Sequence, residues 1–245
     1  MQTKDLPRDG TMETAYPSVV REYLELQPDE TVLSAAKGQL VLQEGDFADH
    51  SILLLDGWMA LYKTLPEGEV QIFDVMLPGD FALIGARIAP VASCSVEALS
   101  DARYMQIMPD LADSTGPGAG DFRALLAAAI VNLQARTSEL MLRLGKGSAA
   151  SRLSYGLIEI YVRLEARNLC RDGRFDLPMT QLQIGQFVGL SNVHVCRTMR
   201  RFEREGILTQ CGGHCIQIED IAALCEIAGI DLDAFRREIL MRRLR

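Results

Sequence analysis

The chain of 245 residues has 48% hydrophobic and 24% charged residues, an ordinary globular composition that excludes wholesale disorder. It is long enough for one large domain or two modest ones. Its longest apolar stretches, such as residues 124–131, are too short to cross a bilayer, and residues 1–16 lack the apolar segment of a signal peptide. We therefore expect a cytoplasmic protein without a membrane segment.

The net charge of −8 is distributed unevenly. Residues 1–145 carry 10 Lys and Arg against 21 Asp and Glu, whereas residues 146–245 carry 15 against 12. The first part would repel nucleic acid and the second could bind it. Four arginines of the second part lie within eight residues: Arg197, Arg200, Arg201 and Arg204. Taken alone, they would indicate only a solvated helix face.

Six cysteines and three histidines give no sign of a disulfide scaffold or a multi-histidine metal centre. Cys211, His214 and Cys215 are neighbours in the sequence, but zinc prefers four ligands and only Cys225 could supply the fourth, so a simple turn is the favoured interpretation. No nucleophile–base pair stands out either. The sequence therefore predicts neither an enzyme nor a resident metal.

Short bulky segments alternate with turn residues from residue 39 to residue 107, which is typical of a sandwich or jelly roll. Glycines stand at the turns, where they tolerate positive φ. Strands are expected at residues 40–42, 52–55, 59–62 and 70–76. We place a jelly-roll sensor domain at residues 29–115, after an N-terminal extension at residues 1–28.

A glycine-rich breaker precedes a long helix expected at residues 120–146, with Asp121 as its N-cap. Apolar residues then recur at alternating spacings of four and three, which is typical of a two-stranded coiled coil. This seam comprises Leu126, Ile130, Leu133, Thr137, Leu140 and Leu144. A dimerisation helix is the favoured interpretation, and a helix packed on its own β-domain is the alternative.

The last hundred residues contain the pattern of a helix-turn-helix. After an amphipathic helix that starts at Ser148, Thr180 and Gln183 form a capping box for a short helix. Gly189 allows a tight turn, and Ser191 caps a second helix at residues 192–205. Its inward-facing residues are expected to be Val195, Met199 and Phe202, and its outward-facing ones His194, Arg197, Thr198 and Arg201.

Strands at residues 207–211 and 215–218 are expected to form a β-hairpin wing. Two short helices joined by a glycine turn, the second rich in arginine, are the layout that places a recognition helix in the major groove of double-stranded DNA. We therefore predict a winged helix-turn-helix domain at residues 147–230. A basic tail helix at residues 231–245, capped by Asp231, would either pack on this domain or contact phosphates.

These segments also resemble the Crp/Fnr transcription regulators over about residues 30–225. The helix-turn-helix resembles theirs at Thr180, Gln181, Ile184, Gly189, Leu190, Ser191, Val195, Arg197, Thr198 and residues 205–208. The first half is similar to that family's effector barrel at Gly38, residues 43–46, Asp56, Gly57 and residues 77–81 and 97–99. Gly145, Ser148 and Ala149 match after the central helix.

The resemblance implies an α+β protein with an N-terminal β jelly-roll effector domain, a long dimerisation helix and a C-terminal winged helix-turn-helix domain. It also implies a homodimer on a pseudo-palindromic promoter, in which the barrel senses a signal and the central helix relays it. Because the family favours activation together with RNA polymerase, we expect an activator.

The chain departs from the cyclic-AMP-binding members of the family. Those members carry a Glu after the Pro-Gly-Asp turn and an Arg-Ser pair farther on, and this chain has neither. A cyclic phosphate would lack its bidentate arginine, for which only Arg87 could substitute. Cyclic AMP is therefore not expected. The corresponding effector pocket would contain Gly79, Asp80, Phe81, Arg87, Ser93 and Cys94.

The positions of the cysteines and histidines bear on the other effectors of the family. The iron–sulfur branch uses an N-terminal cysteine cluster, but no cysteine precedes Cys94, so no iron–sulfur cluster is expected. His50 could ligate haem, although an exposed turn histidine is the favoured interpretation. A signal other than a cyclic nucleotide, cysteine oxidation, a haem-dependent gas sensor and a constitutively active member without effector stay open.

Many family members have Glu at the position of Val193, which could pack on a thymine methyl but accepts no hydrogen bond. Arg197 matches the family's arginine, which implies a bidentate contact to guanine. The other candidates for base or phosphate contacts are Thr180, Gln181, Ser191, Asn192, His194, Thr198, Arg200 and Arg201. Oxidation of Cys196 beside these arginines would block DNA binding, and the alternative is a helix residue without a regulatory role.

Overall fold

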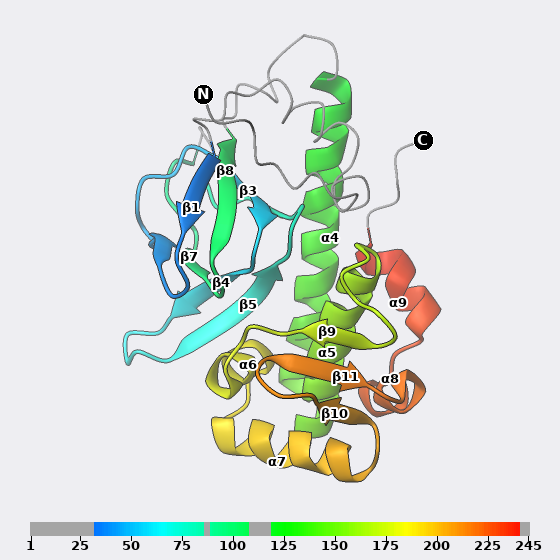
Figure 1. The fold of residues 1–245 in the computed structure, drawn as a ribbon. Coiled ribbons are helices and arrows are strands. Elements are labelled where there is room, and N and C mark those ends of the chain that lie inside the picture. Colours follow the sequence, from blue (N-terminus) through cyan, green and yellow to red (C-terminus); the bar gives the residue numbers. More distant parts are fainter. Residues whose placement is uncertain (1–31, 86–88, 108–118, 241–245) are drawn as a thin grey trace, which may run out of the picture. The chain divides into compact units, whose positions relative to one another are not determined.

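The computed structural model describes residues 32–85, 89–107 and 119–240 (Figure 1). The chain divides into two compact units: one contains residues 75–131 with the chain up to residue 62, and the other contains residues 63–74 and 132–240. Within the described ranges, no helix is long and apolar enough to span a bilayer. The expected N-terminal extension at residues 1–28 lies outside them.

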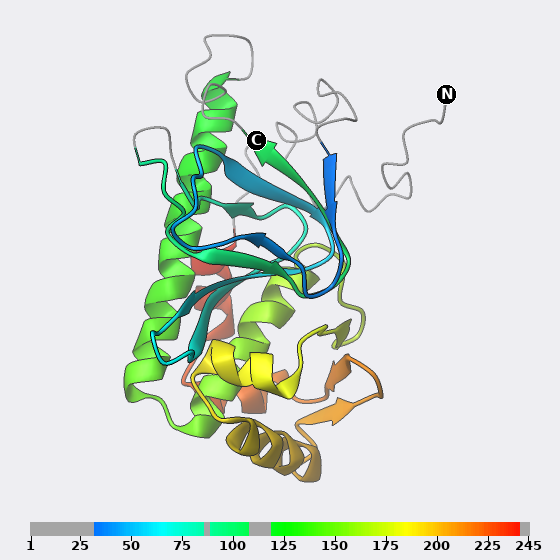
Figure 2. The ribbon, with the colours of Figure 1, turned by 90° about the vertical axis from the view of Figure 1, so that its left-hand side faces the viewer.

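The strands between residues 32 and 107 form two four-stranded sheets in the orders β1-β8-β3-β6 and β2-β7-β4-β5 (Figures 1 and 2). Apart from the β4–β5 hairpin, successive strands alternate between the sheets, which is the jelly roll expected from the sequence. The strands are β1 Val32–Ala35, β2 Leu40–Leu42, β3 Ser51–Asp56, β4 Met59–Thr64, β5 Val70–Met76, β6 Phe81–Ala82, β7 Ser95–Ala98 and β8 Ala102–Ile107.

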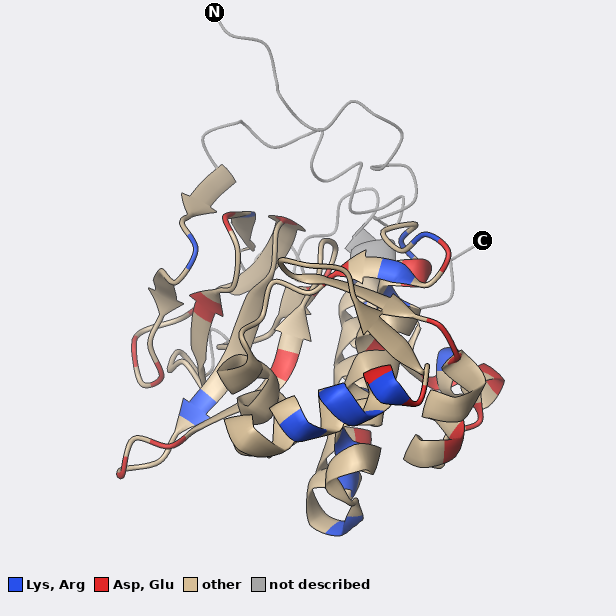
Figure 3. Ribbon diagram, turned by 60° about the horizontal axis from the view of Figure 1, so that its bottom comes forward, with Lys and Arg blue, Asp and Glu red and all other residues tan. Residues whose placement is uncertain are grey.

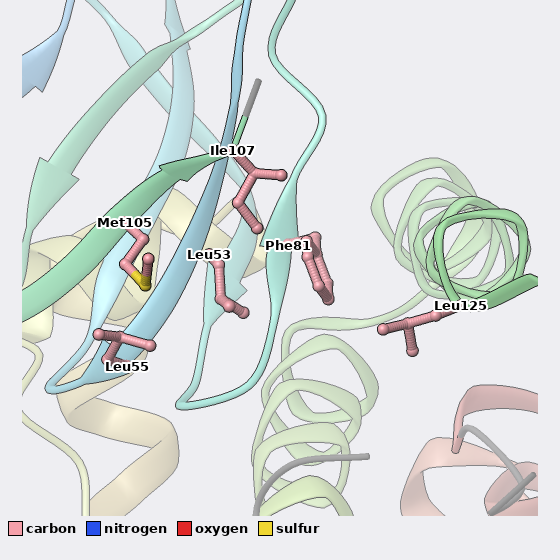
Figure 4. Close-up of a cluster of buried hydrophobic side chains, with 6 residues drawn as sticks. All are labelled: Leu53, Leu55, Phe81, Met105, Ile107 and Leu125. Carbon is pink, nitrogen blue, oxygen red and sulfur yellow. The ribbon is translucent and has the colours of Figure 1, made fainter. Parts of the chain in front are cut away.

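Alternate residues of these strands build a core cluster inside the first unit (Figure 4). β3 and β8 are antiparallel neighbours, with Leu53 opposite Met105. The cluster comprises Leu53, Leu55, Phe81, Met105, Ile107 and, from helix α4, Leu125. The long helix therefore contributes its first turns to the apolar core of the β-domain.

Helix α4 spans Ala119–Lys146, close to the range expected from the sequence. Asp121 lies inside this helix, so the expectation that Asp121 is its N-cap is wrong. Its first half belongs to the first unit and its second half, from Asn132, to the second unit.

The second unit contains the winged helix-turn-helix. The strands form an antiparallel sheet in the order β10-β11-β9. The elements are α5 Ala149–Glu165, β9 Arg174–Asp176, α6 Gln181–Val188, α7 Asn192–Arg204, β10 Leu208–Gln210, β11 Cys215–Ile218, α8 Ile221–Ala228 and α9 Leu232–Ile239. Helix α8 was not expected from the sequence.

The C-terminal helix α9 packs on the second unit through its apolar face. Asp231 is its N-cap, as expected, and accepts from the backbone of Ala234 at 2.7 Å. Phe235 is buried and meets the ring of Tyr155 edge-on, with 5.8 Å between centroids. The described part of the tail is therefore a packing element, whereas residues 241–245 lie outside the described ranges.

Four charged side chains with almost no solvent exposure join three elements of the second unit. Asp74, inside strand β5, receives Arg136 of α4 as a two-pronged pair at 2.9 and 3.2 Å. Arg163 of α5 donates to Glu159 at 2.8 Å, and its guanidinium lies 3.8 Å from Asp74. Burial raises the pKa of Glu159, an effect that the guanidinium groups of Arg163 and Arg136 partly oppose. We name these four residues the buried charge cluster.

The same strand, β5, also contacts the helix-turn-helix. The side-chain amide of Gln71 donates to the carbonyls of Gln186 at 2.6 Å and Phe187 at 3.1 Å. These carbonyls lie in the last turn of α6, where helix carbonyls lack an intrahelical partner. Gln71 of β5 therefore serves as a C-terminal cap for α6, the first helix of the motif.

Replacing Asp74 by Ala should strongly destabilise the second unit, because it leaves two buried guanidinium groups without their shared carboxylate. Breaking a buried pair in this way costs about 3–5 kcal/mol. Urea unfolding followed by circular dichroism measures the loss. The matched control, Glu205→Ala, breaks the exposed Arg201–Glu205 pair and should cost at most about 1 kcal/mol. Equal losses in the two variants would contradict a structural role for the cluster.

Candidate nucleic-acid interface

The helix-turn-helix is built by local capping that the sequence predicts. Thr180 is the N-cap of α6: its hydroxyl accepts from the Gln183 backbone at 3.2 Å, and the Gln183 side chain accepts from the Thr180 backbone at 2.9 Å. Gly189 then ends α6 with φ of +66°. A Cβ there would make the Leu144 side chain move, but the positive φ is what requires glycine.

Ser191 begins the recognition helix α7, as expected. Its hydroxyl accepts from the His194 backbone at 3.4 Å and lies 2.9 Å from His194 Nδ1. The helix ends at Arg204, one residue earlier than expected, with Glu205 as the C-cap and Gly206 at φ of +69° behind it. The side chain of Ser191 therefore caps α7, and the ring of His194 lies against its hydroxyl.

The inward face of α7 consists of Val195, Met199 and Phe202, as the sequence predicts. Thr198 is only 8% exposed, so the expectation that it faces outward is wrong. Thr198 follows Val195 by three residues, which on a helix places both on nearly the same side. The structure gives Thr198 a packing position and removes it from the accessible surface.

A groove of about 760 Å³ runs along the outward face of α7. It is lined by Gln181, Asn192, Val193, Cys196, Arg197, Arg200, Glu203 and Arg204. Figure 3 shows Lys and Arg along α7, with acidic residues near its end. Three guanidinium groups against one carboxylate make the groove a basic one, and backbone phosphates favour such a surface.

Five of the sequence-predicted DNA-binding residues line this groove, and the other five do not. The five in the groove are Gln181, Asn192, Val193, Arg197 and Arg200. Thr180 and Ser191 cap helices, His194 lies against the Ser191 hydroxyl, Thr198 is buried, and Arg201 pairs with Glu205 at 2.8 Å. Glu203 and Arg204 were missed, although their spacing from Arg200 places them on the same helix face.

The wing lies against the C-terminal part of α7. Strands β10 and β11 pair with Leu208 opposite Ile218, and the expected first strand is shorter than residues 207–211. The backbone of Gln210 donates to Glu203 at 3.3 Å. Because Glu203 lines the groove, the wing and the basic groove share a residue.

The residues of the expected effector pocket serve the packing of the first unit. Asp80 accepts from the Leu77 backbone at 2.7 Å and so holds its own turn, while Phe81 and Cys94 are buried. Gly79 has φ of +92°, and the Ser93 backbone donates to Ile84. Arg87 lies outside the described residues.

His50 is not the exposed turn residue that the sequence suggests. Its side chain is only 13% exposed, and Nδ1 lies 3.5 Å from an Asp49 carboxylate oxygen. Among the described residues, no cluster of three or more His, Cys, Asp and Glu could hold a metal ion. Cys211, His214 and Cys215 therefore do not converge as a metal site.

The apolar seam expected on α4 is mostly occupied within the chain. Leu126 packs against the core cluster, Leu140 is 3% exposed, and Leu144 faces Gly189. Leu133 and Thr137 are half-buried. Of the six expected residues, only Ile130 is exposed. The large apolar residues that α4 does expose are Ile130, Val131, Met141 and Leu142, at 52, 63, 66 and 49%.

Those four residues form one stripe. Ile130 and Met141 are eleven residues apart, as are Val131 and Leu142, and eleven residues make almost three whole helical turns. Gln134 and Ser138 are exposed between them. We name these six residues the α4 stripe; it is displaced by about one residue from the expected seam.

Two models of known domains match the chain. Residues 126–227 match a Crp-like helix-turn-helix domain, and residues 32–111 match a cyclic nucleotide-binding domain. The first model thus contains the groove and the wing, and the second contains the jelly roll.

Several known proteins are similar over most of their length. The nitrogen fixation regulation protein FixK of Bradyrhizobium diazoefficiens is 30% identical over 71% of this chain and 72% of that protein. Transcriptional activator protein FnrA of Stutzerimonas stutzeri is 26% identical over 81% of this chain and 80% of its own length. The solved structure of FixK2 from Bradyrhizobium japonicum, at 26% identity, superposes with a TM-score of 0.70 over 80% of this chain and 96% of that one.

Proposed function

Because this chain belongs to the Crp/Fnr family of transcription regulators, we propose that it binds a pseudo-palindromic promoter as a homodimer and activates transcription there with RNA polymerase. The single observation that carries this proposal is the basic groove along the exposed face of α7, beside the wing. Relatives such as FnrA are themselves named transcriptional activators.

Base recognition in this proposal comes from the first turns of α7. Arg197 is central in the groove and has the planar fork that bonds both O6 and N7 of guanine. Arg200, Arg204 and Gln181 flank it and would contact phosphates, which fix the register without reading sequence. Arg201 would contribute less, because its guanidinium already pairs with Glu205.

Val193 would distinguish the operator of this protein from those of relatives with glutamate at that position. It is 65% exposed and lines the groove beside Asn192 and Arg197. A valine side chain offers only apolar surface, and in the major groove the apolar feature of a base pair is the thymine methyl. We therefore expect a thymine preference at the base pair that Val193 meets.

Dimerisation would use the α4 stripe. A narrow apolar stripe of this kind on a long helix is the surface that a second helix covers in a coiled coil. Two copies related by a two-fold axis would present two recognition helices to two half-sites, which accounts for a pseudo-palindromic operator.

The controlling signal in this proposal is not a cyclic nucleotide. Although residues 32–111 match a cyclic nucleotide-binding domain, the Arg-Ser pair of the cyclic-AMP-binding members is absent from this sequence. Oxidation of Cys196 stays the sequence-based alternative, and the groove contains this cysteine beside Arg197 and Arg200. A haem-dependent sensor and a member without effector are the further alternatives.

Replacing Arg197 by Ala should weaken binding to the specific operator far more than binding to random DNA. The expected loss in specific binding is about 1–3 kcal/mol, the usual value of a bidentate guanine contact. Fluorescence anisotropy with labelled duplexes at fixed salt measures both affinities. Arg201→Ala is the matched control, since Arg201 is on the same helix but outside the groove. Equal losses on random and specific DNA would contradict direct base reading by Arg197.

Replacing Val193 by Glu should change the preferred base. The new carboxylate accepts from a cytosine amine, so selection from a random duplex library should replace thymine by cytosine at one position of each half-site. Leu182→Glu is the control, because Leu182 is exposed but does not line the groove. An unchanged selected sequence in Val193→Glu would show that Val193 does not meet a base.

Replacing Val131 or Met141 by Glu should convert the dimer into a monomer, because each change puts a charge into the apolar stripe. Analytical ultracentrifugation of the purified variants measures the mass directly. Leu169→Glu is the control at an exposed apolar position away from α4. A stable dimer in both stripe variants would locate the interface elsewhere.

A further inference from the structure

Two cysteines face each other across the wing hairpin. The register of β10 and β11 pairs Gln210 with Ile216, and one further step places Cys211 opposite Cys215. The Cys211 backbone donates to the Cys215 carbonyl at 3.0 Å. Opposed residues of antiparallel strands have Cα atoms about 4.5–5.5 Å apart. Disulfides span about 4.4–6.8 Å, so the backbone already holds these cysteines at bonding range.

The two sulfurs lie on the same face of the three-stranded sheet. Desolvation, followed by the hydrogen bond and the charge of the neighbouring Cys215 sulfur, raises the pKa of the Cys211 thiol. Cys211 is exposed, whereas Cys215 is only 9% exposed. A small oxidant can therefore approach the pair from the side of Cys211.

A cation lies directly on the inner sulfur. Arg174 of β9 donates its Nε–H to Cys215 Sγ at 3.0 Å. Arg174 pairs with Gln217, two residues from Cys215, so both side chains are on one face of the sheet. The guanidinium therefore holds the Cys215 sulfur on the face of the sheet that Cys211 shares.

We propose that Cys211 and Cys215 are an oxidation site, at which a hydroperoxide forms an intramolecular disulfide across the wing and Arg174 positions Cys215 as the attacking sulfur. This site is distinct from Cys196, which lies in the groove of α7. It depends on the wing fold alone and not on the proposed DNA contacts.

The chemistry requires one equivalent of hydrogen peroxide. The Cys215 thiolate attacks one peroxide oxygen; the O–O bond breaks, a sulfenic acid forms on Cys215, and the departing hydroxide takes up the proton that Cys215 had released. Cys211 then attacks the Cys215 sulfur; the S–S bond forms, the S–O bond breaks, and the second hydroxide leaves as water with the Cys211 proton. Two thiols lose two electrons, and the peroxide is reduced to two waters.

The proposal is tested on the full-length dimer treated with hydrogen peroxide and then alkylated with iodoacetamide. Cleavage after Glu205 and Glu219 releases residues 206–219, which contain Cys211 and Cys215 but neither Cys196 nor Cys225. Mass spectrometry should find this peptide unalkylated and lighter by two hydrogen atoms. Pretreatment with dithiothreitol should restore double alkylation.

Three variants test the roles of Cys196, Cys211 and Arg174. Cys196→Ser should form the wing disulfide at the wild-type rate, whereas Cys211→Ser should leave Cys215 as a sulfenic acid that dimedone labels. Arg174→Gln should slow disulfide formation several-fold, with circular dichroism confirming that each variant is folded.

Three results would overturn the proposal. A doubly alkylated peptide after peroxide would show that the pair is inert. A disulfide that joins either cysteine to another peptide would show that the wing does not hold the pair together. An unchanged rate in Arg174→Gln would remove the positioning role of Arg174. If hydrogen peroxide abolished DNA binding while this disulfide did not form, the wing proposal would fail, but the proposed DNA-binding function would not.

Discussion

The buried charge cluster is the interaction on which the second unit depends. Taking charged groups out of water is costly, and a buried pair offsets that cost only when its partners are placed accurately. Here Asp74 meets Arg136 through two hydrogen bonds, and Arg163 meets Glu159 through another. Arg136 also lies 3.8 Å from Glu159, and Arg163 lies 3.8 Å from Asp74, so the cluster holds β5, the second half of α4 and α5 together. Apolar packing alone would allow these elements to slide, whereas two-pronged ion pairing accepts one geometry.

Further contacts link the helix-turn-helix to the same strand and helix. Gln71 of β5 donates to the last carbonyls of α6, and Gly189 places the following turn against Leu144 of α4. The capping residues Thr180 and Ser191 then set where each helix starts. The position of α6 and of the turn that leads into α7 therefore depends on contacts with β5 and α4 as well as on capping within the motif.

Local signals in the sequence were sufficient for much of this architecture. Capping residues, turn glycines and helical periodicity depend on neighbours a few residues away, so the capping box at Thr180 and the inward face of α7 could be predicted. Long-range facts could not be. The pairing of Asp74 with Arg136 and the burial of Leu140 inside the chain depend on tertiary packing. On α7, the place of Arg197 in the groove followed from the motif, whereas the burial of Thr198 depends on tertiary packing.

The membership of residues 63–74 in the second unit bears on how such proteins diversify. A sensor domain and a reader domain that met only at the end of α4 could be exchanged between relatives by one recombination event. In this chain, a reader fragment that began at Gly147 would bury Glu159 and Arg163 without Asp74 and Arg136, and would leave the end of α6 without Gln71. Exchange by a single crossover is thus penalised, and the two halves are bound to evolve as one inherited piece.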